Sequence, residues 1–327
     1  MLKRSVVIVL VLVGVAGIGC SPTSSPTACD RDCLVEIAEQ YLDALASRDP
    51  EQAALSENIR FVENVTPMQP GEGLWASAAG AATGYRILVS DPVAQTIGFM
   101  TVIDHESEHG VVAAQLAARL LVRGREIVEA EHILADVSEE ADRSRLVTPR
   151  PGLRTEVPLS ARMSREAMSE IAASYYEALD RSDAALASFA PDCERLENGM
   201  ITAGPGLQPE SFESVDVNGR PPPAVARDCA GQVNSRRFAY IDSIDNRRIF
   251  AVDPVSGLAM GFSHFRQSMK HGPHLMIAAD GTEHLWDELR EPYDLPAAHI
   301  FRISDNQIHE VEAIGIFVPY ASPTGWE

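Results

Sequence analysis

The chain has 327 residues and a formal net charge of −20 at neutral pH, from 27 Lys and Arg against 47 Asp and Glu. Hydrophobic residues make up 45% of it, which suffices for a folded core and excludes a disordered chain. So acidic a balance disfavours nucleic acids and charge-driven binding to anionic lipids, because cationic side chains supply most of both affinities. At about 150 residues per domain, the length predicts two domains.

The N-terminus is typical of an export signal. Two basic residues precede an apolar run over residues 6–15, which is shorter than the roughly 18 residues of a membrane-spanning helix. Residues 1–19 are therefore predicted to be a signal peptide. Small residues followed by Cys20 resemble a bacterial lipobox, which implies a lipid on Cys20 and a Ser/Pro/Thr-rich tether over residues 20–32. We expect a lipid anchor in the periplasm, at the outer membrane or at the cell surface, with plain secretion as the alternative.

The cysteines fit an oxidising compartment. A lipid on one of the five leaves four that can form two disulfides. Those four are Cys29, Cys33, Cys193 and Cys229. Three pairings are open, and nearness in sequence favours Cys29–Cys33 and Cys193–Cys229. A metal site is the rival interpretation, but no CxxC motif or Cys/His cluster supports it.

The chain also matches itself. Residues 34–64 align with residues 168–198 at a constant offset of 134. Further matches are Asp91-Pro92-Val93 and Gly98-Phe99 with Asp253-Pro254-Val255 and Gly261-Phe262, and Ile127–Glu131 with Ile308–Glu312. Matched blocks in the same order predict a duplicated domain rather than a solenoid, because the period exceeds 100 residues.

The predicted boundaries follow from this repeat. The first domain covers residues 33–147, and a Pro- and Gly-rich linker covers 148–163. The second domain covers residues 164–327 and carries inserted loops at 203–228 and 267–296. The loop at 267–296 is a lid over a pocket, a solvated embellishment or a dimer contact. Because both fall on the second domain, we expect the working pocket there.

Each domain is predicted to begin with a helix and to continue with strands. Apolar residues at helical spacing predict helices near residues 34–45 and 168–179, and Ser164 is the expected N-cap of the latter. Asp49-Pro50 predicts the start of a second helix. Strands are expected at 59–64, 85–89, 96–103, 111–122, 126–134, 193–198, 237–241, 258–265, 299–303 and 307–318, with a short helix at 283–289. For the Ala-rich residues 111–122, a helix is the alternative. Helices followed by a run of strands predict an α+β fold with an antiparallel sheet.

Several stretches together resemble nuclear transport factor 2-like (SnoaL-like) domains. They are Ile59-Arg60-Phe61-Val62-Glu63-Asn64, Gly71-Glu72-Gly73-Leu74-Trp75, Tyr85-Arg86, Asp91-Pro92, Gly98-Phe99, Cys193 with Glu197-Asn198-Gly199, Cys229–Asn234 and Val318-Pro319-Tyr320. The chain is similar, over about residues 33–326, to secreted proteins with two such halves. This implies two tandem cone-shaped half-barrels, each a curved sheet wrapped on its N-terminal helices around a pocket. The family pattern has Gly after Glu-Asn, where this chain has Val65. The wider fold includes isomerases, dehydratases, epoxide hydrolases, cyclases and lyases as well as binding modules, so it selects no reaction.

The repeated Glu63-Asn64 and Glu197-Asn198 pairs are the first candidate site residues. Side chains alternate along a strand, so one member of each pair faces inward. A buried carboxylate in an apolar cone can serve as a general base. The alternative is a hydrogen-bonded strand end that caps a turn.

Other candidates lie along the predicted strands. His264 and His299 share faces with apolar neighbours, which suits either a general base or a satisfied core histidine. Trp75 and Arg86 are candidates to line a pocket in the first half, with core packing as the alternative for Trp75.

The sequence therefore leaves three functions open. The first is a cofactor-independent lyase, dehydratase or isomerase acting on an apolar or aromatic small molecule. Its catalytic residues would be Glu197, His264 and His299, and its substrate-binding residues Asn198, Asn234, Tyr240, Glu63, Asn64, Trp75 and Arg86. The others are a small-molecule carrier and a structural lipoprotein. No nucleotide-binding, Ser-elbow or zinc-protease motif occurs, so we expect no cofactor and no metal. The membrane is expected as a partner only through the N-terminal lipid, and a homodimer stays open.

Overall fold

The computed structural model describes residues 28–108, 110–137, 139–207, 228–278, 281, 283–286 and 291–327. The predicted signal peptide, Cys20, most of the tether and most of the 203–228 loop lie outside these residues. In the part of the chain described, no helix is both long and apolar enough to cross a membrane.

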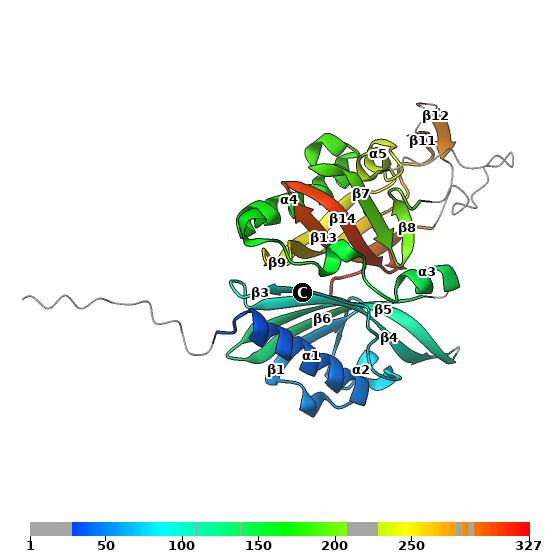
Figure 1. Cartoon of the computed structure of the whole chain (residues 1–327). Coiled ribbons are helices and arrows are strands. Elements are labelled where there is room, and N and C mark those ends of the chain that lie inside the picture. The colour runs from blue at the N-terminus through cyan, green and yellow to red at the C-terminus, as the bar shows by residue number, and fades with distance from the viewer. Residues whose placement is uncertain are drawn as a thin grey trace, which may run out of the picture.

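The fold is α+β, with two large sheets and few helices (Figure 1). The N-terminal part contains α1 (Arg31–Ser47), η1 (Pro50–Gln52), β1 (Leu55–Glu63), β2 (Thr66–Met68), α2 (Leu74–Ser77), β3 (Arg86–Asp91), β4 (Thr96–Ser107), β5 (Gly110–Arg123) and β6 (Glu126–Asp136). Its strands form the first sheet, in the order β2-β1-β6-β5-β4-β3. All pairs are antiparallel except β1 with β6.

Three short helices connect this part to the second: α3 (Glu140–Arg145), η2 (Pro151–Arg154) and η3 (Leu159–Ala161). The second part contains α4 (Arg165–Arg181), η4 (Ala184–Leu186), β7 (Phe189–Glu197), β8 (Met200–Ala203), α5 (Cys229–Asn234), β9 (Ser243–Asp253), β10 (Leu258–Gln267), β11 (His274–Ile277), β12 (Glu283–Trp286), β13 (Tyr293–Ser304), β14 (Gln307–Gly315) and β15 (Val318–Pro319). The second sheet has the order β8-β7-β14-β13-β10-β9, with β15 on β13, and β11 and β12 form a separate hairpin. The first and second sheets therefore share one strand order.

The two long helices end as their sequences predict. The Asp30 side chain caps α1 by accepting from Cys33 N, and the predicted cap Ser164 accepts from Ala167 N at 3.2 Å. Both helices stop at a residue in the left-handed region. The helix predicted at Asp49-Pro50 is one 3-10 turn, η1.

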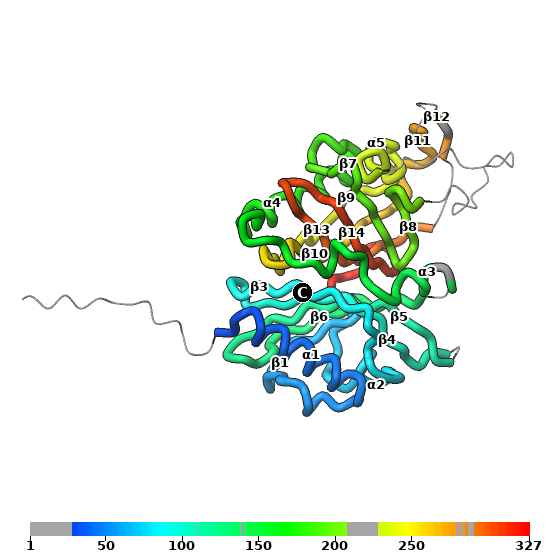
Figure 2. The backbone as a smooth tube through the Cα atoms, viewed as in Figure 1, coloured from blue at the N-terminus to red at the C-terminus, as the bar shows by residue number. Residues whose placement is uncertain are grey.

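The two sheets pack against each other through the faces that their helices leave free. α1 and the inner face of the first sheet enclose one core, and α4 does the same for the second sheet. The opposite faces of the two sheets lie against each other (Figures 1 and 2). A third core joins these faces and includes Met100, Ile133, Met260, Phe262 and Ile300. Burial of both faces makes the sheets parts of one packed molecule.

Two ion pairs cross this contact reciprocally. Arg31 at the start of α1 binds Asp253 at 3.2 Å, and Arg165 at the start of α4 binds Asp91 at 2.8 Å. The arginines are one repeat offset apart, and the aspartates are the matched residues of the Asp-Pro-Val blocks. In each half, the first turn of the long helix therefore binds the same aspartate position of the other half.

Two predicted elements are wrong. Residues 237–241, expected as a strand, form successive turns after α5, with Ile241 N donating to Phe238 O at 3.0 Å. The helix expected at 283–289 is a strand over Glu283–Trp286, because these residues pair with β11; residues 287–289 lie outside the described part. In both places tertiary contacts override the local pattern.

One repeat match is also wrong in register. Gly98 faces the second sheet, where an added Cβ would lie 2.5 Å from Met260 Sδ, whereas Phe99 lies in the first core. Gly261 faces the inner core, and Phe262 belongs to the contact between the sheets. The two Gly-Phe pairs are therefore one residue out of step, which inverts their faces.

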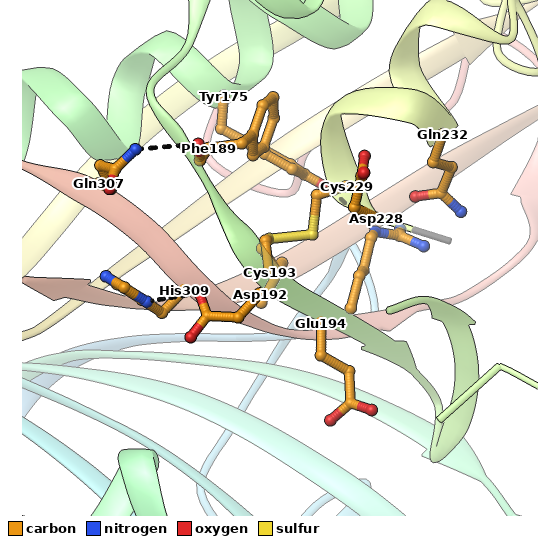
Figure 3. The surroundings of a disulfide bond; sticks show 12 residues. Tyr175, Phe189, Asp192, Cys193, Glu194, Asp228, Cys229, Gln232, Gln307 and His309 are labelled. Carbon is orange, nitrogen blue, oxygen red and sulfur yellow. Dashed lines mark hydrogen bonds and ion pairs between the residues drawn. A yellow bond between two sulfur atoms is a disulfide. The ribbon is translucent and has the colours of Figure 1, made fainter. Parts of the chain in front are cut away.

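The structure confirms the two favoured disulfides, Cys29–Cys33 and Cys193–Cys229. Cys193 lies on β7 and Cys229 begins α5, so the second disulfide joins helix to strand (Figure 3).

Candidate functional site

The repeated Glu-Asn pairs divide their roles between two faces. The Asn64 side chain binds the backbone of the neighbouring strand β6. Its Oδ1 accepts from Leu134 N at 2.9 Å, and its Nδ2 donates to Leu134 O at 3.1 Å. Asn198 makes the same two bonds with Gly315 at 3.0 Å each. Both asparagines thus hold a strand end, as the structural interpretation predicted, and both glutamates face the interior.

Side chains of the first sheet fill its own interior. His132 Nδ1 lies 3.0 Å from Glu63 Oε2, and His132 Nε2 lies 2.9 Å from Tyr41 Oη. Leu74 N also donates to Glu63. Burial and then the Glu63 carboxylate raise the pKa of Tyr41, so its hydroxyl stays protonated. Trp75 packs edge-on against Tyr41 at 5.2 Å, which is the core-packing alternative. The cluster is buried throughout.

Arg86 takes no part in this cluster. It pairs with Glu39 on α1, so it ties β3 to the helix at the outside of the first core.

The second sheet encloses a cavity of about 210 Å³. Two exchanges distinguish it from the filled interior. Arg195 stands one repeat offset from Phe61, and Ala313 is the strand partner of Glu197 where His132 is the partner of Glu63. The lining residues are Arg195, Glu197, Met200, Thr202, Gln232, Arg237, Phe238, Tyr240, Gln267, Trp286, Tyr293, Leu295 and Phe317.

Arg195 is the buried polar centre of this cavity, with 5% of it exposed. Its Nε donates to Tyr175 Oη at 2.9 Å, its Nη1 to Thr202 Oγ1 at 2.6 Å and its Nη2 to Glu197 Oε2 at 2.7 Å. Burial opposes the charge, but Tyr175 and Glu197 outweigh it and raise the pKa of Arg195. Arg195 therefore stays charged and fixes the Glu197 carboxylate at the cavity wall.

The Cys193–Cys229 disulfide links two elements that line the cavity, β7 and α5. Cys193, Arg195 and Glu197 alternate along β7, so all three share its inner face. Cys229 begins α5, and Gln232 follows one turn later (Figure 3). Gln232 Nε2 donates to Thr202 O at 2.7 Å. The disulfide and this hydrogen bond together hold α5 against β7 and β8.

Aromatic side chains form the other side of the cavity. Tyr240 stacks on Trp286 of the hairpin, with ring centroids 5.1 Å apart and planes at 17°. Tyr293 and Phe317 pack edge to face at 5.0 Å. Phe317 is also largely exposed, so the apolar wall continues to the surface.

The predicted histidines lie outside the cavity lining. His299 is 1% exposed and packs in the core against Tyr175 and Phe301. Its Nδ1 lies 3.2 Å from Tyr176 Oη. Burial and the charge of Arg195 hold the pKa of His299 well below its usual value. His264 points the other way from β10, towards the first sheet, where its Nε2 lies 3.4 Å from Asp294 Oδ2.

Sequence reasoning thus found only part of the cavity. Of the predicted residues, Glu197 and Tyr240 meet in the lining; Asn234 is exposed and its Oδ1 accepts from Ala184 N. It missed Arg195, Thr202, Gln232 and Gln267. Arg195 could have been found, because the repeat alignment sets a cation opposite the apolar Phe61. Within the described residues, no group of three or more His, Cys, Asp or Glu could hold a metal ion.

Comparison with known proteins gives a family match for the second half only. Residues 161–315 match the model of a domain of unknown function, DUF8021. No curated protein matches the chain. Among solved structures, PrhC from Penicillium brasilianum NBRC 6234 is 13% identical, with a TM-score of 0.27 over 32% of this chain and 81% of its own. A hypothetical protein with a ketosteroid isomerase-like fold from Catenulispora acidiphila DSM 44928, in complex with trimethylamine, is 16% identical, with a TM-score of 0.25 over 30% of this chain and 83% of its own. At these TM-scores the likenesses carry no argument about activity.

Proposed function

We propose that this chain is an exported protein that binds a small molecule in the cavity of the second sheet. The observation that carries the proposal is the contrast between the two interiors. Where the first sheet has Phe61 and His132, the second has Arg195 and Ala313. Arg195 and Glu197, the strand partner of Ala313, line a cavity of about 210 Å³. A polar centre facing an aromatic wall is the usual composition of a ligand site.

The proposal includes the tandem arrangement expected from the repeats. The shared strand order and the reciprocal Arg31–Asp253 and Arg165–Asp91 pairs support an internal duplication. In this arrangement the filled first half supports the hollow second half, and one fused chain provides a contact that two separate copies would otherwise have to make.

Exchanging the residues that distinguish the interiors tests the binding proposal. Ala313→His would place an imidazole beside Glu197 and fill the cavity, as His132 does beside Glu63. In affinity selection with a library of planar aromatic compounds, we expect wild type to retain compounds that Ala313→His does not. His132→Ala, the reverse exchange, is the matched control and should retain the same compounds. Equal retention by both variants would contradict the proposal.

Export and lipid anchoring are tested separately. Expression in a lipoprotein-processing bacterium with a labelled fatty acid should label the wild-type chain, whereas Cys20→Ser should stay unlabelled. A mature chain that keeps residues 1–19 would contradict the proposed export and lipid anchoring.

A second candidate function is cofactor-independent proton transfer by a lyase, dehydratase or isomerase. It is favoured by one observation, the Glu197 carboxylate at the cavity wall, with Oε2 held by Arg195 at 2.7 Å. Glu197 would take a proton from carbon, and Arg195 or Tyr240 would stabilise the developing oxyanion. In D₂O, a retained ligand should exchange its acidic C–H with wild type and not with Glu197→Gln, which keeps the shape. Retention without any exchange would leave a binding protein.

A further inference from the structure

The cavity wall contains a buried amide whose oxygen no described residue satisfies. Gln267 is the last residue of β10, on the same face as Phe265, and it is 2% exposed. Its Oε1 has no hydrogen-bond partner among the described residues. Buried polar groups are nearly always paired, because an unpaired one keeps the full penalty of desolvation. An amide in this position, lining an open cavity, points to a partner that comes from a ligand.

The polar centre of the same cavity also offers a donor beside an acceptor. Arg195 uses three of its five N–H groups for Tyr175, Thr202 and Glu197, and among the described residues the other two have no acceptor. Glu197 accepts the hydrogen bond from Arg195 Nη2 through Oε2, and no described residue donates to Glu197 Oε1. The ion pair of Arg195 with Glu197 has no net charge. A carboxylate ligand there would approach the Glu197 carboxylate and be repelled.

The aromatic wall and the volume limit the shape of the ligand. Tyr240 and Trp286 form a flat stacked surface, and Tyr293 with Phe317 forms a second apolar one. A cavity of about 150 Å³ holds a single benzene ring. The cavity of about 210 Å³, with its apolar mouth, suits one or two fused rings.

We propose that Gln267 is a specificity-determining residue that binds the edge of an uncharged planar ring compound in which a donor lies next to an acceptor. Lactams, aromatic amides and enol–carbonyl systems have such an edge. This inference rests on the proposed function and specifies the ligand class of the same cavity.

Three probes of similar shape test the edge. Quinolin-2-one is a planar lactam with a donor and an acceptor, quinoline has only the acceptor, and 2-naphthoate has a negative charge. Binding is followed by calorimetry and by ligand-observed NMR on the full mature chain. We expect wild type to bind quinolin-2-one about tenfold more tightly than quinoline, and 2-naphthoate no more tightly than quinoline.

Gln267→Leu is the matched variant, because it keeps the approximate size and removes the amide. It should lower the affinity for quinolin-2-one about tenfold and leave that for quinoline nearly unchanged. It should also melt at the same temperature as unliganded wild type or higher, because no internal hydrogen bond is lost. An amide with a structural partner would instead lower the melting temperature.

The outcomes separate this inference from the proposed function. Tighter binding of 2-naphthoate, or equal loss of all probes in Gln267→Leu, would overturn the inference and leave a small-molecule site. Failure of wild type to bind any of the probes would also overturn it. If Ala313→His and wild type also retain the same compounds from the library, the proposed function fails.

Discussion

At the residue scale, the turn after β1 contains a β-branched residue in a conformation suited to glycine. Asn64 and Val65 have φ values of 47° and 61°, and the matching turn in the second sheet has Asn198 at 50° and Gly199 at 83°. Such a two-residue turn requires positive φ at both positions, which costs a β-branched side chain most. Val65 therefore stores strain that Gly199 does not.

Val65→Gly should stabilise the chain by about 1 kcal/mol, because relief of the left-handed strain outweighs the entropy that glycine adds to the unfolded state. Urea unfolding of the two proteins measures the difference. The matched control is Val93→Gly, at an exposed position without positive φ, which should destabilise slightly. Equal losses in both variants would show that the Val65 turn carries no strain.

His299 gives a pH dependence at the same scale. Its pKa is well below 6.5 in the folded chain, because burial and then Arg195 disfavour the imidazolium. The unfolded chain takes up this proton near pH 6.5 and the folded chain does not, so stability falls as the pH drops below that value. Between pH 7.5 and 5.5, wild type should lose about 1 kcal/mol more than His299→Gln in urea unfolding.

The control for this pH effect is Tyr176→Phe. It removes the bond to His299 Nδ1 and leaves the imidazole in place. Its stability should be lower than that of wild type by a similar amount at both pH values. A pH slope in His299→Gln equal to that of wild type would show that another group takes up the proton.

At the element scale, the Cys193–Cys229 disulfide has a larger effect than the Cys29–Cys33 disulfide. It closes a loop with a sequence separation of 36, against 4 for the other. On the chain-entropy model, these loops correspond to about 4 and about 2 kcal/mol. The Cys193→Ala/Cys229→Ala variant should therefore lose about twice as much free energy of unfolding as Cys29→Ala/Cys33→Ala. It should also bind ligand more weakly, because α5 is released from β7. Equal losses would contradict the loop-length argument.

Elements that bury one regular face were predictable from the sequence, and elements defined by distant partners were not. The helical spacing and capping residues of α1 and α4 lie within single segments, so they could be identified directly. Glu283–Trp286 became a strand only through pairing with β11. Residues 237–241 turn because Phe238 and Tyr240 face a cavity whose lining comes from five strands, β7, β8, β10, β12 and β13. The same limit applies to the site. Alternation placed Glu197 inside, but the assignment of His264 failed because both faces of β10 are buried and apolar residues occupy each.

At the scale of the whole molecule, the contact between the sheets makes the two halves depend on each other. The third core takes side chains from both sheets, and the Arg31–Asp253 and Arg165–Asp91 pairs frame it. A core shared in this way couples the unfolding of its two sides. Wild type should therefore unfold in one transition, with hydrogen exchange in α1 and in β10 rising at the same urea concentration.

Gly98→Val tests this coupling. Gly98 lets the sheets approach, because a Cβ there would lie 2.5 Å from Met260 Sδ and 2.8 Å from the Phe250 ring. The added side chain must push the second sheet away, at a cost of about 1–3 kcal/mol, and exchange in α1 and β10 should then rise at separate urea concentrations. Gly84→Val is the control, because an added Cβ meets nothing within 4 Å there. If Gly98→Val unfolds in the same single transition as Gly84→Val, the close approach of the sheets does not hold the halves together, and the reciprocal ion pairs must couple them instead.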